Sequence, residues 1–188
     1  MAAPAEPEFR VASRPEGWTV DQVLALPEEH TSGNRVELVD GVLNVSPAPA
    51  SAHQRLLQKL QLALAPRLPG GTELLPGVNV RFGEKRLLIP DFVVLTCPAV
   101  DTTWYSATDL LLVAEIESPS TRVQDRILKK ALYAEALIPY YLLVDPAQEP
   151  VAATVFGLDG GEYVPVGKSE GGVLELVEPF AARVDLRG

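Results

Sequence analysis

The segment DLLLVAEIESPSTRVQDRILKKALYAEALIPYYLLVDP, residues 109–146, decides the fold class. Its first part, DLLLVAEIESP, is rich in apolar and β-branched residues without strict alternation, as expected of a strand covered on both faces. The middle part, residues 121–139, consists of good helix formers and stops before Pro139. The last part, YYLLVDP, is a second short apolar strand. The segment therefore predicts a strand, helix, strand unit with a right-handed crossover.

Paired strands are predicted on both sides of this unit. The clearest pair is RVELVDGVLNVSP, residues 35–47, because apolar residues alternate around Asp40-Gly41, a strong hairpin signal. Strands are also expected at residues 72–82 and 86–96, joined by a turn. Residues 151–167 predict another hairpin around a second turn, and a last strand within residues 171–186 is expected to extend the sheet.

Two more helices are predicted before the central unit. The first follows Thr19, a residue type that caps helix N-termini, and is limited by Pro27. The second covers SAHQRLLQKLQLALAPRL, residues 51–68, where Ser51 and Gln54 match the capping-box pattern. Its leucines recur on one face, and His53 shares that face.

Together these elements predict an α/β or α+β domain, in which a mixed sheet is flanked by helices. The first 17 residues carry no apolar period and are expected to form a flexible arm, followed by a single domain over residues 18–188. The sequence shows neither a membrane-spanning run nor a secretory leader, so we expect a cytoplasmic protein. Cys97 is the only cysteine, which excludes an intrachain disulfide and a zinc cluster of several thiolates.

The overall charge restricts the partners. Sixteen basic and 25 acidic residues give a net charge of −9, which should repel a polyanion. Non-specific coating of nucleic acid is therefore not expected. An enzyme that meets a phosphodiester through bound divalent cations remains compatible with this charge, because an occupied metal site inverts the local field.

Three carboxylates fall at the ends of predicted buried strands: Asp91, Glu115 and Glu117. Burying a carboxylate is costly unless a cation or hydrogen-bond donors meet it. Glu115 and Glu117 are two residues apart and so point to the same face of a strand. If Asp91 lies on the neighbouring strand, it and Glu115 could converge on a hard cation such as Mg²⁺.

The helix after this strand places a lysine near the acids. Asp125, Lys129 and Tyr133 follow one another at intervals of four residues, so they share one helix face. Lys129 can then reach over the sheet. Beside a phosphate it would orient a nucleophile or stabilise developing negative charge.

Several motifs in this order resemble the Uma-two family of restriction-endonuclease-like proteins, a branch of the PD-(D/E)XK nuclease superfamily. They are RVELVDG, SAHQRL, IPDFVVL, VAEIESPST, DRILKKALYAEA and IPYYLLVDP. The resemblance runs from about Thr19 to the end of the chain. It implies the restriction-endonuclease-like core, with a metal site at the forked end of the sheet, an extra N-terminal hairpin and extra C-terminal strands.

The resemblance also implies roles for individual residues. Pro90-Asp91 is similar to the PD element and Glu115 to the acid of the ExK element, so both are metal-ligand candidates. Glu117 stands where the superfamily usually has lysine, and it is either an additional outer acid or an obstacle to phosphate. The lysine has migrated to Lys129, with Lys130 as a weaker substitute. Two further positions match the family near the site: Glu37, an additional metal contact, and His53, an orienting or phosphate-contacting residue.

The leading hypothesis is a Mg²⁺-dependent endonuclease, with Mn²⁺ as an alternative metal and DNA as substrate. Asp91 and Glu115 would hold the metal, the backbone carbonyl of Ile116 would be a third ligand, and Lys129 would assist the attack on the phosphodiester. The alternative is a non-catalytic module that uses the same fold as a DNA-binding or protein-interaction platform. The C-terminal strands could pair across a two-fold axis into a homodimer.

Structural roles would also account for these residues. Asp91 could cap a strand or pair with Arg81, and Glu115 with Lys129 could be a structural ion pair. His53 could be a core residue, and Glu37 an exposed strand acid. The tyrosines, Tyr133 among them, are expected to pack in the core and on the sheet.

Overall fold

The computed structural model describes residues 14–27, 34–118 and 124–187, with the side chains of residues 124–126 left out. The chain divides into two compact units, and each is described by itself. The first comprises residues 1–48 and 81–89, and the second residues 49–80 and 90–188. Most of the predicted arm, residues 1–13, lies outside the described residues. The single domain over residues 18–188 stays a prediction.

The first unit joins one short helix to a hairpin. Its elements are α1 (Val20–Leu24), β1 (Arg35–Val39), β2 (Val42–Ser46) and β5 (Leu87–Leu88), with β1 antiparallel to both other strands. Thr19 caps α1 as predicted, since Thr19 and Gln22 bind each other's backbone N–H groups. Asp40 and Gly41 have φ of 49° and 83°, the positive values that the predicted two-residue hairpin turn requires.

The second unit is built on a six-stranded mixed sheet in the order β11-β10-β9-β8-β6-β3. Its strands are β3 (Glu73–Pro76), β6 (Phe92–Leu95), β8 (Leu110–Ile116), β9 (Tyr140–Asp145), β10 (Ala152–Asp159) and β11 (Glu162–Lys168). β8 and β9 are parallel, and the other neighbours are antiparallel. The predicted strand, helix, strand unit is therefore confirmed at the centre of this sheet.

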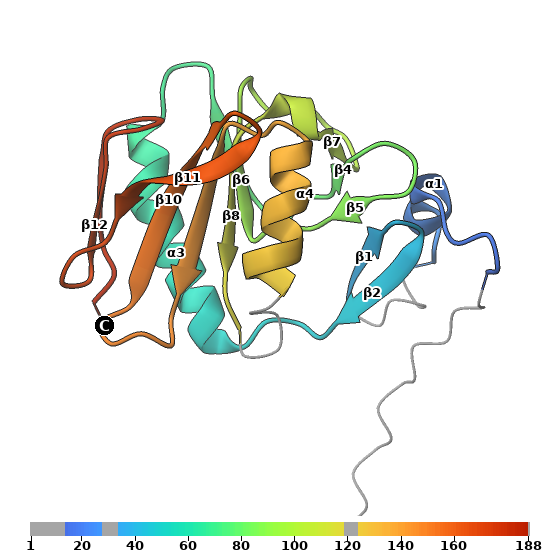
Figure 1. Cartoon of the computed structure of the whole chain (residues 1–188), viewed down its shortest axis with the longest axis horizontal. Coiled ribbons are helices and arrows are strands. Elements are labelled where there is room, and N and C mark those ends of the chain that lie inside the picture. The colour runs from blue at the N-terminus through green and yellow to red at the C-terminus, as the bar shows by residue number, and fades with distance from the viewer. Residues whose placement is uncertain (1–13, 28–33, 119–123, 188) are drawn as a thin grey trace, which may run out of the picture. The chain divides into compact units, whose positions relative to one another are not determined.

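Helices cover both faces of the sheet (Figure 1). α3 (Ser51–Leu64) places Leu57, Leu60 and Leu64 in one buried cluster with Leu112, Ala114 and Ile116 of β8. The opposite face of β8 meets the π-helix η3 (Gln124–Lys129) and α4 (Lys130–Glu135). Because side chains alternate along a strand, Glu115 points away from α3 and toward α4. The mixed sheet with flanking helices agrees with the predicted fold class.

Three local predictions were wrong. Ser51 does not cap α3: the helix begins at Ser51, and Ala50 precedes it without a side-chain cap. The predicted hairpin of residues 72–96 divides into β3, β4 (Val80–Arg81), β5 and β6, with β3 paired directly to β6. Pro76, Gly77 at φ 59° and Pro90 interrupt its strands.

The third wrong prediction concerns the C-terminal segment, which forms a separate hairpin instead of extending the sheet. Its strands are β12 (Val173–Leu176) and β13 (Ala182–Asp185). Leu174 and Val184 are fully buried in the cluster that holds the α3 leucines, and this apolar burial stabilises the hairpin at its place beside α3. The described residues also form three short elements: β7 (Tyr105–Ser106), the 3₁₀ turn Ala107–Asp109, and the 3₁₀ turn Ala65–Arg67 after α3. Within the described ranges, no helix is long and apolar enough to cross a membrane.

Candidate active site at the fork of the sheet

Asp91 stands where β8 separates from β6. The last pair of these two strands is Phe92 with Ala114, and continuing the register by one residue sets Asp91 opposite Glu115. The backbone N–H of Asp91 donates to the Ala114 carbonyl at 3.1 Å, and the N–H of Ile116 donates to Asp91 Oδ2 at 2.7 Å. The Asp91 side chain thus replaces the backbone partner that β8 loses at the fork. The register therefore sets Asp91 next to Glu115, while a cation shared by their two carboxylates stays a prediction.

His53 reaches the same carboxylate from α3. Its Nε2 lies 3.1 Å from Asp91 Oδ2, and the side chain is 13% exposed. The buried Nδ1 has no hydrogen-bond partner in the described part of the chain. His53 is therefore tied to Asp91 through one ring nitrogen, while the other remains available as an acceptor in the neutral imidazole. The alternative that His53 is only a core residue does not account for its contact with Asp91.

Two residues from the covering helix meet on Glu115. Lys129 Nζ donates to Glu115 Oε1 at 3.0 Å, and the Tyr133 hydroxyl donates to the same oxygen at 2.6 Å. Lys129 and Tyr133 are four residues apart, so successive turns present both donors to the strand. The predicted approach of Lys129 to the acids is confirmed for Glu115. The side chain of Asp125, expected on the same face, lies outside the described residues.

Tyr133 is the site residue that sequence reasoning missed. The sequence predicts a core position, and Tyr133 is indeed fully buried, yet its hydroxyl also makes a hydrogen bond of 2.6 Å to Glu115. Its ring also lies 5.6 Å from that of Tyr141 on β9. The spacing of four residues from Lys129 was the available signal. From this spacing, a contact of the Tyr133 phenol with the same carboxylate that Lys129 binds could have been predicted.

Glu37 lies in the first unit and is buried there. Its Oε1 accepts a hydrogen bond from the Ile89 N–H at 2.9 Å, and the Arg35 guanidinium donates to the Ile89 carbonyl. The interpretation of Glu37 as an exposed strand acid is therefore wrong. Because Glu37 and Asp91 belong to different units, a place for Glu37 beside the metal-ligand candidates stays a prediction.

Comparison with known proteins gives the chain its family. A family model described as "Uma2: Putative restriction endonuclease" matches residues 15–187. The chain belongs to the Uma2 family. A solved structure, a "putative nuclease belonging to DUF820" from Anabaena variabilis ATCC 29413, matches with 20% sequence identity and a TM-score of 0.54. The match covers 78% of this chain and 83% of the other, and it supports the nuclease fold. No curated protein matches.

The donor set of this Uma2 chain suits a hard divalent cation. Asp91 and Glu115 are only 4% and 3% exposed, and Glu117 beside them is also buried, so negative charge is concentrated at the fork. In the described ranges, no group of three or more His, Cys, Asp and Glu side chains gathers as a metal cage. Mg²⁺ does not need one, since it is usually held by one or two carboxylates and keeps several waters. The residues present therefore fit such an ion.

Proposed function

We propose that this protein is a metal-dependent endonuclease that hydrolyses phosphodiester bonds of DNA. The observation that supports the proposal is the register at the fork, which sets the buried residues Asp91 and Glu115 on adjacent positions of two neighbouring strands, with Lys129 bound to Glu115. Membership in a family described as "Putative restriction endonuclease" supports a nuclease. The DUF820 structure, described as a "putative nuclease", adds support of the same kind.

In this proposal Asp91 and Glu115 hold the metal, Mg²⁺ with Mn²⁺ as the alternative. The Ile116 carbonyl is a third ligand and Glu37 a further contact. The cation supplies Lewis-acid chemistry, since it polarises the phosphate and lowers the pKa of water. The Ile116 N–H bond to Asp91 Oδ2 supports this set, because it fixes the carboxylate relative to the Ile116 backbone.

The donors around the carboxylates have positioning roles. Lys129 holds Glu115 in place and brings a positive charge to the site, where it offsets the charge of an approaching phosphate. Tyr133 fixes the same oxygen from the next turn, and His53 orients Asp91. Glu117, in the usual place of the lysine, adds negative charge beside Glu115. This makes the enzyme's reliance on Lys129 and on the cation stronger.

Further parts of the proposal concern the setting of the enzyme. The exposed thiol of Cys97 is compatible with a reducing compartment, and we place the protein in the cytoplasm. A homodimer through the C-terminal hairpin is also proposed. Val177, which follows β12 and is 83% exposed, offers an apolar contact for it.

Cleavage of a plasmid library with random inserts, together with circular single-stranded DNA, tests the proposal without knowledge of a target sequence. We expect nicking or cutting with Mg²⁺ or Mn²⁺ and none with EDTA. Asp91→Asn, Glu115→Gln and Lys129→Met should each lose most of the activity. Glu162→Gln removes a charge from an exposed position on β11 and should cleave like the wild type. A folded wild type that cleaves neither DNA with either metal contradicts the proposal and favours the non-catalytic platform.

A further inference from the structure

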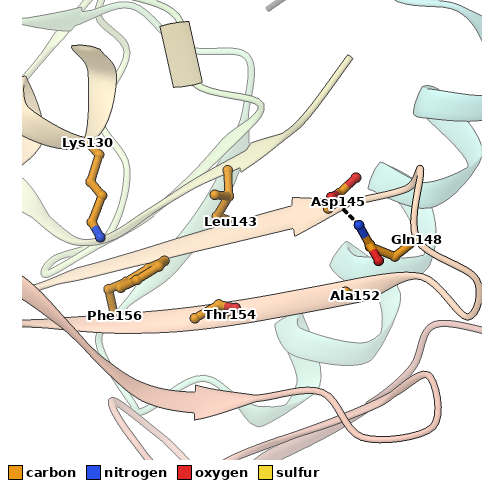
Figure 2. A pocket seen from close by; sticks show the side chains of 7 residues that line it. All are labelled: Lys130, Leu143, Asp145, Gln148, Ala152, Thr154 and Phe156. Carbon is orange, nitrogen blue, oxygen red and sulfur yellow. Dashed lines mark hydrogen bonds between the residues drawn. The ribbon is translucent and has the colours of Figure 1, made fainter. Parts of the chain in front are cut away.

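A pocket of about 410 Å³ lies on the second unit's sheet, on the face that Glu115 occupies (Figure 2). Glu115 pairs in register with Leu143 of β9, and Leu143 pairs with Thr154 of β10. Residues paired in register point to the same face, so these three side chains form one row across the sheet. The pocket is lined by Leu143, Thr154 and Lys130, the last of which follows Lys129 in the chain.

We propose that this pocket binds one nucleotide of a single nucleic-acid strand, next to the nucleotide whose phosphate lies at Glu115. The proposal rests on the proposed function and names a binding subsite for its substrate. Neighbouring strands are about 4.8 Å apart, so the row extends roughly 10 Å from Glu115 to Thr154. A nucleotide adjoining the reacting one can reach that far.

The chemistry of the lining suits a base and its phosphate. Leu143, Ala152 and Phe156 provide an apolar floor, with Thr154 between them. Most small-molecule sites have such an apolar lining with a few polar groups. Phe156 is held from one side by Tyr141, whose ring stacks on it at 5.9 Å with an interplanar angle of 20°. A ring fixed in this way is a suitable platform for a base.

Lys130 supplies the cation. Its ammonium lies 3.7 Å from the centroid of the Phe156 ring. Figure 2 shows the Lys130 side chain extending toward Phe156. Burial lowers the pKa of Lys130, so a nearby anion would stabilise its charged form. The flexible lysine side chain can move from the ring to a phosphate and leave the ring face to the base.

The polar end of the pocket is fixed by hydrogen bonds. Asp145 accepts one bond from the Ala147 N–H at 2.9 Å and one from Gln148 Nε2 at 3.2 Å. The second bond is drawn in Figure 2. It orients the Gln148 amide, whose oxygen can then accept from the edge of a base. The Thr154 hydroxyl can donate and accept.

Fluorescence anisotropy in EDTA tests the pocket independently of cleavage. A short labelled single-stranded oligonucleotide is compared with one of equal length in which every nucleotide is abasic. We expect the normal strand to bind at least about fivefold more tightly, the lower end of the effect of one base stacked on an aromatic ring. Equal binding of the two strands would overturn the proposal.

Three variants locate the effect. Phe156→Leu keeps an apolar side chain but should abolish the preference for the normal strand, and Lys130→Met should weaken binding of both strands. Lys59→Met removes the same charge from α3, outside the pocket lining, and should change neither. The thermal midpoint of each variant checks that it is folded. A Phe156→Leu protein that keeps the full preference contradicts the assignment.

Three further outcomes distinguish a strand-binding pocket from a site for free nucleotides and from the nuclease activity itself. Saturable binding of free deoxynucleoside monophosphates with no binding of the oligonucleotide would assign the pocket to free nucleotides and overturn the proposal that it binds a nucleic-acid strand. Cleavage without base-dependent binding would overturn the proposed nucleotide-binding role of the pocket and leave the proposed nuclease activity in place. Base-dependent binding without cleavage in the presence of Mg²⁺ or Mn²⁺ would overturn the proposed nuclease activity and leave the proposed nucleotide-binding role of the pocket in place.

Discussion

Replacing Lys129 by methionine should destabilise the protein more than most single substitutions. The Lys129 ammonium lies 3.0 Å from Glu115 Oε1, and both residues are buried. At an effective dielectric constant of about 20, two unit charges at this distance attract by roughly 5 kcal/mol. Removing one partner of a buried pair leaves the other charge in the interior and costs about 3–5 kcal/mol. We therefore expect Lys129→Met to lower the free energy of unfolding by that amount in EDTA.

A double-mutant cycle with Glu115→Gln isolates the pair. Chemical denaturation of the four proteins should give a coupling free energy of at least about 2 kcal/mol, with the double variant more stable than the sum of the single effects predicts. The matched control is the pair Arg183 and Glu175, whose atoms lie 3.4 Å apart but whose side chains are 64% and 74% exposed. Its coupling should stay below about 1 kcal/mol, as usual for surface pairs.

Metal should act on the same variant. A divalent cation at Glu115 would replace the lost positive charge, so Mg²⁺ should restore part of the stability of Lys129→Met. It should not restore Lys129→Met in combination with Asp91→Asn and Glu115→Gln. Single-variant effects that add to within about 0.5 kcal/mol would refute the reasoning, because they would mean that the two charges do not depend on each other.

Three further predictions concern other residues. Tyr133→Phe removes a 2.6 Å bond to a carboxylate and should cost about 1.5–3 kcal/mol in denaturation, with a parallel loss of cleavage. His53→Leu removes one bond to Asp91 and a ring nitrogen that has no partner among the described residues, so the stability of the protein should change by less than about 1.5 kcal/mol while cleavage falls; unchanged cleavage would refute the role of His53. Burial raises the pKa of Tyr163, so the folded state holds the phenol proton more tightly than the unfolded state, and stability should fall as the pH rises above about 10. Tyr163→Phe should make this fall shallower, and an identical alkaline profile would contradict the assignment.

The central unit could be predicted because local and tertiary signals agree there. Residues 109–146 carry continuous apolar strands around a helix, and β8, α4 and β9 form accordingly. The position of Lys129 on the helix face that covers the sheet, together with the cost of burying the Glu115 carboxylate, predicted the contact between these two residues. The position of Asp91 next to Glu115 was predicted from its Pro90-Asp91 motif and from the same cost of burying a carboxylate.

Other features depend on tertiary packing that no local pattern contains. The C-terminal hairpin could have extended the sheet, but its apolar residues are buried with α3 instead. The bond from Ile116 N–H to Asp91 arises only because two strands separate at that residue. The Tyr133 hydroxyl meets Glu115 only in the packed fold, although its spacing of four residues from Lys129 indicates that both side chains can reach the same acid. Ser51 matched a capping pattern, although the helix begins one residue earlier than that pattern requires.

Thermal unfolding with and without Mg²⁺ or Mn²⁺, on the wild type and on Asp91→Asn, tests the metal site most directly. Asparagine can still accept the Ile116 N–H bond, so the variant removes the charge with little change in shape. A ligand that binds only the folded state stabilises it by about 2.7 kcal/mol at a hundredfold excess over its Kd. We predict a metal-dependent rise of the wild-type midpoint that Asp91→Asn loses. An equal rise in both proteins, or none in either, would contradict a cation held by Asp91 and Glu115.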